Sequence, residues 1–202
     1  MTEITLSPGS LKVLSVLISP TKEYNVHGLA ARANLSAMGV SKVVRQLRER
    51  GLVTIRVLGR SYLIKLNKSS QNILPFCLAE QYRFHDFIKT HLPLKGFLIS
   101  IRNKLEDKAT FSLIFGSYAS GEESASSDLD LLIVTSHKKE ALNIIKTAKV
   151  LVDIELSPII VTLDEFITKL KEKHRLYTEI INGKRVILTG EYDFWRIVLK
   201  RI

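Results

Sequence analysis

The sequence predicts an α/β (α+β) protein with two modules: an N-terminal group of helices closed by a hairpin, followed by a mixed sheet flanked by helices. Apolar residues recur at helical spacing through the first 50 positions, and two short strand-like segments then lie on either side of Gly59. Farther along, apolar segments at 110–115, 128–134, 151–161 and 186–189 alternate with amphipathic stretches. The length of 202 residues also exceeds that of one common domain.

The first 50 residues predict three helices. We expect Ser10 to cap the first and Asn25 to cap the second, because short polar side chains accept hydrogen bonds from the free N–H groups of a first turn. A short turn at 34–36 leads to a third helix at about 37–50, which Gly51 ends. The expected inward residues of the three helices are Leu11, Val13, Leu14, Leu17, Ile18, Leu29, Ala30, Ala33, Val40, Val43, Val44 and Leu47.

After the third helix, segments 52–57 and 61–66 flank a Leu-Gly-Arg turn, which predicts a hairpin. Three short helices closed by a two-stranded wing resemble the winged helix-turn-helix of prokaryotic transcription regulators, chiefly over residues 26–36 and 47–53. The resemblance implies that the third helix enters the major groove of double-stranded DNA, while the wing reaches phosphate or a minor groove. The residues that it marks for DNA contact are Ser36, Met38, Ser41, Lys42, Arg45, Arg56 and Arg60.

Positive charge is concentrated in this N-terminal module. The chain carries 30 Lys and Arg against 20 Asp and Glu, and residues 1–67 hold ten of the basic residues but only three of the acidic ones. The resulting excess of +7 favours a polyanionic partner. The alternative is a winged helix that serves only dimerisation or protein contact.

A polar loop at 67–72 follows the hairpin. We expect a connecting helix at 74–89, whose aromatic residues pack between domains or across a homodimer, and another helix at 94–107 before the sheet. We find neither a secretory signal nor an apolar run long enough to span a bilayer, so we expect a cytoplasmic protein. The expected domains are residues 1–67, a linker and connecting helix at 68–91, and residues 92–202.

In the stretch 115–134, an apolar strand ends at a Gly-Ser turn, and a second strand opens ten residues later with Asp-Leu-Asp. Because side chains alternate along a strand, Asp128 and Asp130 project to one face. Two aligned carboxylates suit Mg²⁺ or Mn²⁺, which prefer oxygen ligands. Gly116 lets a phosphate approach the backbone closely, and Ser117 can donate to it. The expected nucleotide-binding residues are Gly116, Ser117 and Ser127.

This motif resembles the signature of the DNA polymerase β-type nucleotidyltransferase superfamily, in its minimal nucleotidyltransferase branch. The resemblance covers the motif in full and, more loosely, residues 92–202. It implies a polymerase-beta-like mixed sheet and transfer of a nucleoside monophosphate from a nucleoside triphosphate, with ATP expected, to a hydroxyl. Asp128 and Asp130 would be the metal ligands. The alternative is a hairpin whose two aspartates only form the solvated face of an edge strand.

The resemblance also implies a third carboxylate on a neighbouring strand, acting as general base or metal ligand. In the expected strand 151–161, Asp153, Glu155 and Ser157 share a face if pairing is regular. Counting back from the expected helix start at 162–166 places Ser157 at or near the acidic position and Glu155 one pleat away. We prefer Glu155 to Asp153 as the catalytic residue. An ordinary polar strand face is the alternative for both acids, and Pro158 marks an edge or a bulge.

Members of this branch commonly act beside small helical toxins of the HEPN class, which they modify on a tyrosine. The resemblance therefore implies an antitoxin that also regulates transcription and acts on a toxin-like protein partner. A second hypothesis is a transcription regulator whose nucleotidyltransferase fold senses nucleotide without catalysis. A third is modification of a small molecule such as an aminoglycoside.

Overall fold

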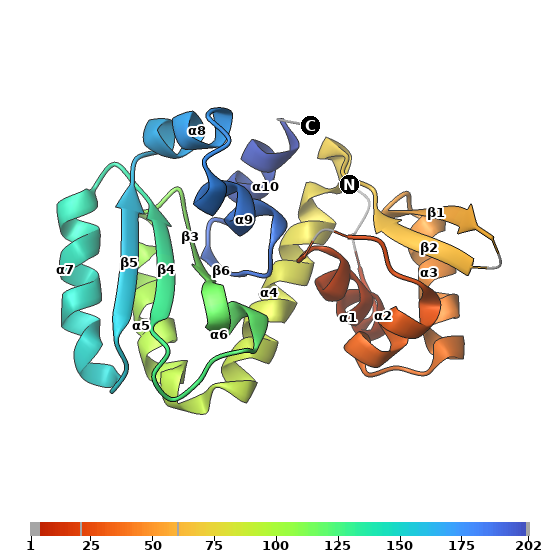
Figure 1. Ribbon diagram of the computed structural model, residues 1–202, viewed down its shortest axis with the longest axis horizontal. Coiled ribbons are helices and arrows are strands. Elements are labelled where there is room, and N and C mark those ends of the chain that lie inside the picture. The colour runs from red at the N-terminus through yellow and green to blue at the C-terminus, as the bar shows by residue number, and fades with distance from the viewer. Residues whose placement is uncertain (1–4, 21, 60, 201–202) are drawn as a thin grey trace. The chain divides into compact units, whose positions relative to one another are not determined.

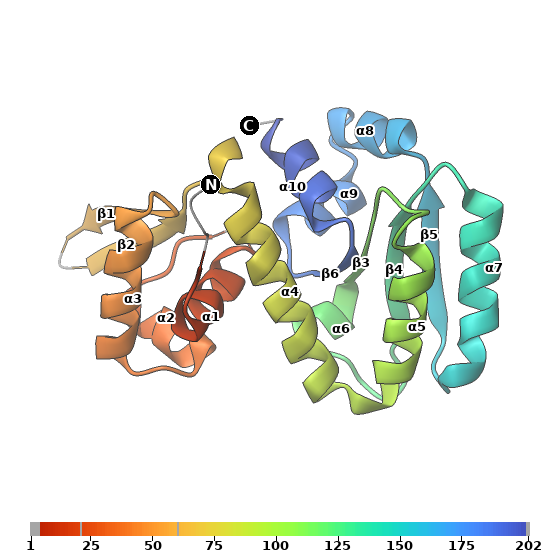
Figure 2. The same cartoon turned by 180° about the vertical axis from the view of Figure 1, so that it is seen from behind.

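The computed structural model describes residues 5–20, 22–59 and 61–200, so Arg60, one of the expected DNA contacts, lies outside the described residues. The chain divides into two compact units (Figures 1 and 2). The first comprises residues 1–82 with 195–202, and the second comprises residues 83–194. The division falls inside a long helix, α4 (Ile73–Thr90), and not in the polar loop at 67–72.

Three helices open the first unit: α1 (Pro8–Leu17), α2 (Val26–Ala33) and α3 (Ala37–Glu49). Asn25 caps α2 as predicted, accepting a hydrogen bond from the Gly28 N–H at 2.7 Å. The prediction for α1 was wrong: its cap is Ser7, which accepts from the Ser10 N–H at 3.1 Å, and Ser10 is buried inside the helix. Pro8 explains the earlier start, because its ring fixes a helical φ and it has no N–H to leave unpaired.

The hairpin consists of β1 (Val53–Leu58) and β2 (Ser61–Leu66), paired antiparallel in register. Gly59 forms the turn with a φ of 58°, which a glycine adopts without strain. Ile64 faces the helices and bridges to Tyr24, just before α2. The core of the unit contains the inward residues expected from the sequence, except that Leu11 and Ala30 are only half-buried.

The first unit also includes a short helix, η1 (Ser70–Asn72), the start of α4, and the end of α10 (Glu191–Leu199). Buried Asn72 donates to the carbonyl oxygens of Gly51 and Asn67, which ties the polar loop to the end of the hairpin. Phe76 of α4 packs on Trp195 of α10, with 4.8 Å between ring centroids. The segment that follows the hairpin is therefore held by hydrogen bonds and aromatic packing, unlike a flexible linker.

The second unit contains a four-stranded mixed sheet in the order β5, β4, β3, β6 (Figure 1). Its strands are β3 (Phe111–Phe115), β4 (Leu129–Val134), β5 (Leu156–Val161) and β6 (Val186–Thr189). β3 pairs antiparallel with β4 and β6, whereas β4 and β5 are parallel. β5 forms one edge of the sheet, in agreement with the presence of Pro158.

Helices cover both faces of this sheet. On one face, α5 (Lys95–Leu105) and α7 (Lys138–Ala148) pack over the apolar side chains of β4 (Figure 2). The other face carries Phe111, whose ring meets Phe166 of α8 (Leu163–Lys171) edge-on at 5.1 Å and Phe194 at 5.4 Å. Between α8 and β6 lies α9 (Arg175–Asn182), and the remaining short helices are α6 (Gly116–Ser120), η2 (Leu92–Leu94) and η3 (Lys149–Leu151).

The strand expected at 151–161 begins only at Leu156. Residues 149–151 form η3, and the ammonium group of Lys149 donates to the carbonyl oxygen of Ile154, so the backbone before Leu156 turns instead of extending. By contrast, the expected helix start at 162–166 is confirmed. Thr162 and Glu165 form a capping box in which each side chain accepts from the other residue's N–H.

Within the described residues, no helix combines the length and apolar character needed to cross a membrane.

Candidate active site

Asp130 is the second residue of β4, and both neighbouring strands place it. It lies opposite Phe115, the last residue of β3, and level with Ser157 on parallel β5. Residues that lie opposite one another in a ladder share a face, so Asp130, Phe115 and Ser157 point to the face that carries Phe111. The two strands therefore bring a half-buried carboxylate to the end of β3, where the Gly-Ser turn begins.

Gly116 starts this turn with a φ of 71°, in the left-handed region. A Cβ atom at position 116 would lie 2.1 Å from the Oδ2 atom of Asp130, which real atoms cannot tolerate. Both the backbone angle and the space therefore require glycine here. The Asp130 carboxylate packs directly against the Gly116 backbone, which joins the two halves of the sequence motif in space.

Burial raises the pKa of the Asp130 carboxyl above its ordinary value, and the charge of Asp128 raises it further. Asp128 is exposed and lies just before β4. A half-buried carboxylate with a second negative charge nearby forms a site that a cation would stabilise.

The donor set fits magnesium. Over 5–20, 22–59 and 61–200, no three or more His, Cys, Asp or Glu side chains gather to hold a metal ion, so a protein-only cage is absent there. A pair of carboxylates instead leaves coordination positions for phosphate oxygens and water, which is how proteins usually bind Mg²⁺.

The two candidate serines have different surroundings. Ser117 is half-buried in the first turn of α6, and its carbonyl oxygen accepts from the Ser120 hydroxyl. The Ser127 hydroxyl accepts from the Ser124 N–H at 2.9 Å, so it stabilises the loop that leads to Asp128. Of the two side chains, Ser117 is the one beside Gly116.

The position level with Asp130 on β5 is occupied by Ser157, a residue without a carboxylate. Glu155 and Asp153 precede the strand and line a small polar cavity of about 200 Å³ together with Asp128. The Glu155 side chain is 81% exposed and lies 3.6 Å from the ammonium group of Lys149. The structure thus places both acids beside Asp128 and neither of them level with Asp130.

A second cavity, of about 450 Å³, has Gly116 in its lining. Gly116, Ser120 and Glu122 line one wall, and residues of α9 with Gly183 and Lys184 line the opposite wall. The Lys184 ammonium group donates to the Ser120 carbonyl oxygen at 2.6 Å. Sequence reasoning missed this lysine, because its partner lies 64 positions earlier in the chain.

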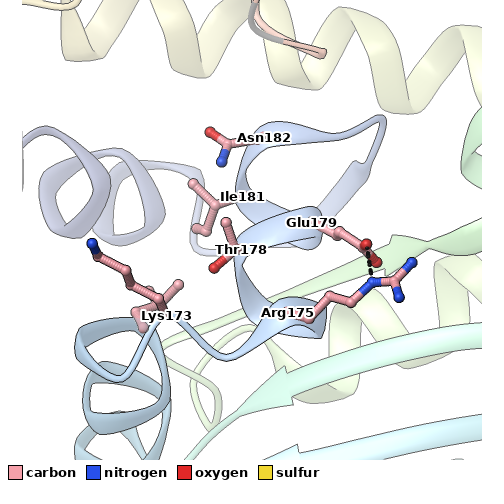
Figure 3. A pocket seen from close by; sticks show the side chains of 7 residues that line it. Lys173, Arg175, Thr178, Glu179, Ile181 and Asn182 are labelled. Carbon is pink, nitrogen blue, oxygen red and sulfur yellow. Dashed lines mark hydrogen bonds and ion pairs between the residues drawn. The ribbon is translucent and has the colours of Figure 1, made fainter.

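The outer side of α9 borders a third cavity, of about 610 Å³. Its lining includes Lys173, Thr178 and Asn182 (Figure 3). Figure 3 also shows Arg175 and Glu179 turned toward each other, with 2.7 Å between the Arg175 Nε atom and the Glu179 Oε1 atom. Glu179 lines both this cavity and the one beside Gly116. Arg175 is its ion-pair partner.

In the first unit, α3 buries its apolar side against the other helices and exposes the opposite side. Met38 is 84% exposed, and Ser41, Lys42 and Arg45 are exposed with it. Ser36 is the cap of α3, accepting from the Gly39 N–H at 3.0 Å. Arg56 lies on β1, where its guanidinium donates to Glu23 at 2.6 Å.

Comparison with known families finds a similarity within the second unit. Residues 98–192 match the model of the family described as Polymerase beta, Nucleotidyltransferase. This range includes the Gly-Ser turn, both aspartates and β5, and it excludes the three helices and hairpin of the first unit. No match was found among curated proteins or among solved structures. Residues 98–192 are thus similar to the polymerase beta nucleotidyltransferases, which supports a transferase domain in this part of the chain.

Proposed function

We propose that the second unit is a magnesium-dependent nucleotidyltransferase that moves a nucleoside monophosphate from a nucleoside triphosphate to a hydroxyl group. The observation that carries the proposal is the contact between the Asp130 carboxylate and Gly116, where the motif's acid and its phosphate-binding turn meet. The family match over residues 98–192 supports the reaction class.

In the proposed reaction, the acceptor oxygen forms a bond to the α-phosphorus while the bond from that phosphorus to the bridging oxygen breaks. Pyrophosphate leaves and the acceptor hydroxyl loses its proton. Asp128 and Asp130 would hold Mg²⁺ or Mn²⁺, which when bound offsets negative charge on the phosphates and on the leaving group. The backbone at Gly116 and the hydroxyl of Ser117 would hold the phosphate tail, with ATP as the expected donor.

Glu155 is our proposed general base, and Asp153 is the alternative. Both share the polar cavity with Asp128, so an acceptor hydroxyl that enters this cavity would come near all three acids. The exposure of Glu155 suits a group that must release a proton to solvent. Protein tyrosines, such as that of a toxin-like partner, are among the acceptors that fit the antitoxin role.

The deciding experiment combines the full-length chain, Mg²⁺, each of the four ribonucleoside triphosphates and the protein encoded by the neighbouring gene. We expect release of pyrophosphate with one triphosphate and covalent addition to the partner, detected by mass spectrometry. Asp130→Asn should abolish both signals. Equal pyrophosphate release by the Asp130→Asn variant would overturn the assignment of the site.

A second candidate function is a transcription regulator that binds a nucleotide without transferring it. The specific observation in its favour is Ser157, which stands level with Asp130 where the family pattern implies an acid. Metal and phosphate binding require fewer groups than activation of an acceptor. Triphosphate binding that depends on Asp130, with no transfer to any acceptor, would favour this regulator.

For the first unit we propose a winged helix-turn-helix that binds double-stranded DNA. The exposed side of α3 carries Met38, Lys42 and Arg45, and the hairpin carries Arg56. The excess of basic over acidic residues in 1–67 supports an anionic partner. A homodimer in the cytoplasm, bound to a palindromic operator, is the assembly that such a module commonly forms.

A further inference from the structure

Apart from Gly116, the residues that line the cavity of about 450 Å³ have no role in the reaction described above. We propose that it holds the nucleoside of the bound triphosphate and that Lys184 positions the phosphate tail. This inference rests on the proposed function, because it names a further binding residue for the same substrate. It concerns a cation and an apolar wall that lie outside the Gly-Ser and Asp-x-Asp motifs.

The backbone fixes where Lys184 stands. The Gly183 N–H donates to the Glu179 carbonyl oxygen at 2.6 Å, and α9 ends there in a bend. A Cβ atom at position 183 would lie 2.6 Å from the same oxygen, so this turn requires glycine. The adjacent Lys184 therefore enters the cavity from a constrained turn, and its ammonium group lies at the C-terminal end of α6, on Ser120.

Charge balance points to a phosphate ligand for Lys184. A nucleoside triphosphate carries several negative charges, and the two motif aspartates add two more. Among the described residues that line the cavity, Lys184 alone carries a positive charge. The lining also carries the carboxylates of Glu122 and Glu179. Glu179 is paired with Arg175, as Figure 3 shows, and Glu122 is exposed to water that screens its charge, so both oppose a phosphate less than a buried, unpaired carboxylate would.

The remaining lining suits a nucleoside. Phe115, Leu176 and Ile180 supply apolar surface, against which the flat face of a base can pack. Gly116 lies in the same lining, so a nucleoside in the cavity would have its phosphates at the Gly-Ser turn. The Asp130 carboxylate packs against Gly116, so the cavity adjoins the proposed metal site.

A purely structural role for Lys184 predicts a different outcome. If Lys184 only joined α6 to the turn after α9, its removal would disturb the cavity as a whole and weaken nucleoside and triphosphate binding equally. A phosphate-binding lysine instead affects the triphosphate and leaves the nucleoside alone. The ratio of these two affinities is therefore the measurement that distinguishes the two roles.

The experiment uses the full-length chain with Mg²⁺. ATP, GTP, CTP and UTP are compared by calorimetry, and the nucleoside of the tightest-binding triphosphate is then titrated by NMR, which detects weak binding. We expect Lys184→Met to raise the Kd for the triphosphate by about tenfold or more, as loss of a charge-assisted hydrogen bond would. The Kd for the nucleoside should stay the same, and Lys184→Arg should retain most of the affinity.

Two matched variants complete the design. Lys139→Met removes an exposed lysine of α7 and should change neither Kd. Leu176→Gln places a polar group in the cavity lining and should weaken nucleoside and triphosphate binding to a similar extent.

If Lys184→Met raises the Kd for the nucleoside and for the triphosphate equally, the role of Lys184 is only structural and the inference is overturned. Triphosphate binding that needs Asp130 but is unchanged in Lys184→Met would do the same, while leaving the proposed function intact. If the unmutated chain binds none of the four triphosphates, the proposed function itself fails.

Discussion

Asp130 on β4 stands level with Ser157 on the parallel strand β5, and the two side chains share one face of the sheet. A carboxylate at position 157 would lie on the same face as Asp130 and beside it. The chain instead carries its nearest additional acids, Glu155 and Asp153, before the strand begins. This arrangement makes nucleotide binding and nucleotide transfer separately testable.

Replacement of the motif acids should separate binding from folding. We expect Asp128→Asn and Asp130→Asn each to weaken Mg²⁺-dependent triphosphate binding strongly, measured by calorimetry. Because the folded state raises the pKa of Asp130, it disfavours the ionised carboxylate, and at neutral pH an uncharged asparagine should leave Tm unchanged or higher. Asp107→Asn, which removes an exposed acid after α5, is the control. Unchanged affinity in both motif variants would show that the metal site lies elsewhere.

Gly116→Ala should damage the site more than Gly121→Ala. Both glycines have φ near 70°, so each substitution brings backbone strain of about 1–2 kcal/mol. Only at position 116 does the new Cβ meet another group, the Asp130 carboxylate, whereas position 121 has open space. Thermal unfolding and triphosphate titration of the two variants therefore isolate the contact with Asp130. Equal losses of affinity would indicate that backbone strain alone explains the effect.

The general base should be identified by its effect on transfer alone. We expect Glu155→Gln to abolish transfer and to retain triphosphate binding, because an amide cannot accept the acceptor's proton. Asp153→Asn should matter less, and the same pyrophosphate assay measures both. If Asp153→Asn is inactive while Glu155→Gln remains active, the two assignments must be exchanged.

A related substitution tests position 157. Ser157→Asp introduces a carboxylate level with Asp130. If the unmutated chain only senses nucleotide, we expect this variant to bind Mg²⁺ more tightly in a manganese-competition titration, because a third carboxylate adds an oxygen ligand. Ser157→Ala is the control and should leave affinity for the ion unchanged. An unchanged affinity in Ser157→Asp would mean that this position does not face the ion.

Glu23 should restrain DNA binding through Arg56. The two side chains form an exposed ion pair, and the same contact lowers the pKa of the Glu23 carboxyl, with the Arg56 hydrogen bond as the largest cause. We expect Glu23→Gln to strengthen binding to all duplex sequences, because it frees a guanidinium and removes a negative charge. Arg56→Ala should weaken binding to all sequences and reduce the salt dependence by about one phosphate contact.

Electrophoretic mobility shifts over a salt series with the full-length chain measure these effects. Glu172→Gln, which breaks a comparable surface ion pair with Lys169 in the second unit, is the matched control. Lys42→Ala and Arg45→Ala should additionally relax sequence preference, at about 1–3 kcal/mol for each lost base contact. No shift at low salt with the region upstream of the gene would exclude the DNA-binding proposal.

Local signals in the sequence predicted much of the fold, because their physical causes are local. The cap of α2 and the start of α8 could be predicted, since at both places the accepting side chain and the N–H that it serves lie three residues apart. Gly116 and Asp130 were identified from their motif, although the sequence alone could not reveal the direct contact between them.

Features that depend on distant partners could not be predicted. The late start of β5 arises from η3 and from the bond between Lys149 and Ile154, which no strand propensity reveals. Helix α9 was not predicted from the sequence. The chain leaves α8 at Lys173, which adopts a left-handed backbone, and no glycine or proline marks the break between the two helices. The contact between Lys184 and Ser120 exists only in the folded chain, so the sequence could not mark this lysine as a candidate binding residue.

Pro158 on the edge strand β5 limits how the sheet can grow. An edge strand offers unpaired backbone groups to which another chain can add, and a proline in that strand has no N–H to contribute. The same edge adjoins the polar cavity that contains Asp128. Unwanted strand addition, and the aggregation that follows from it, is thus discouraged at the edge of the sheet beside that cavity.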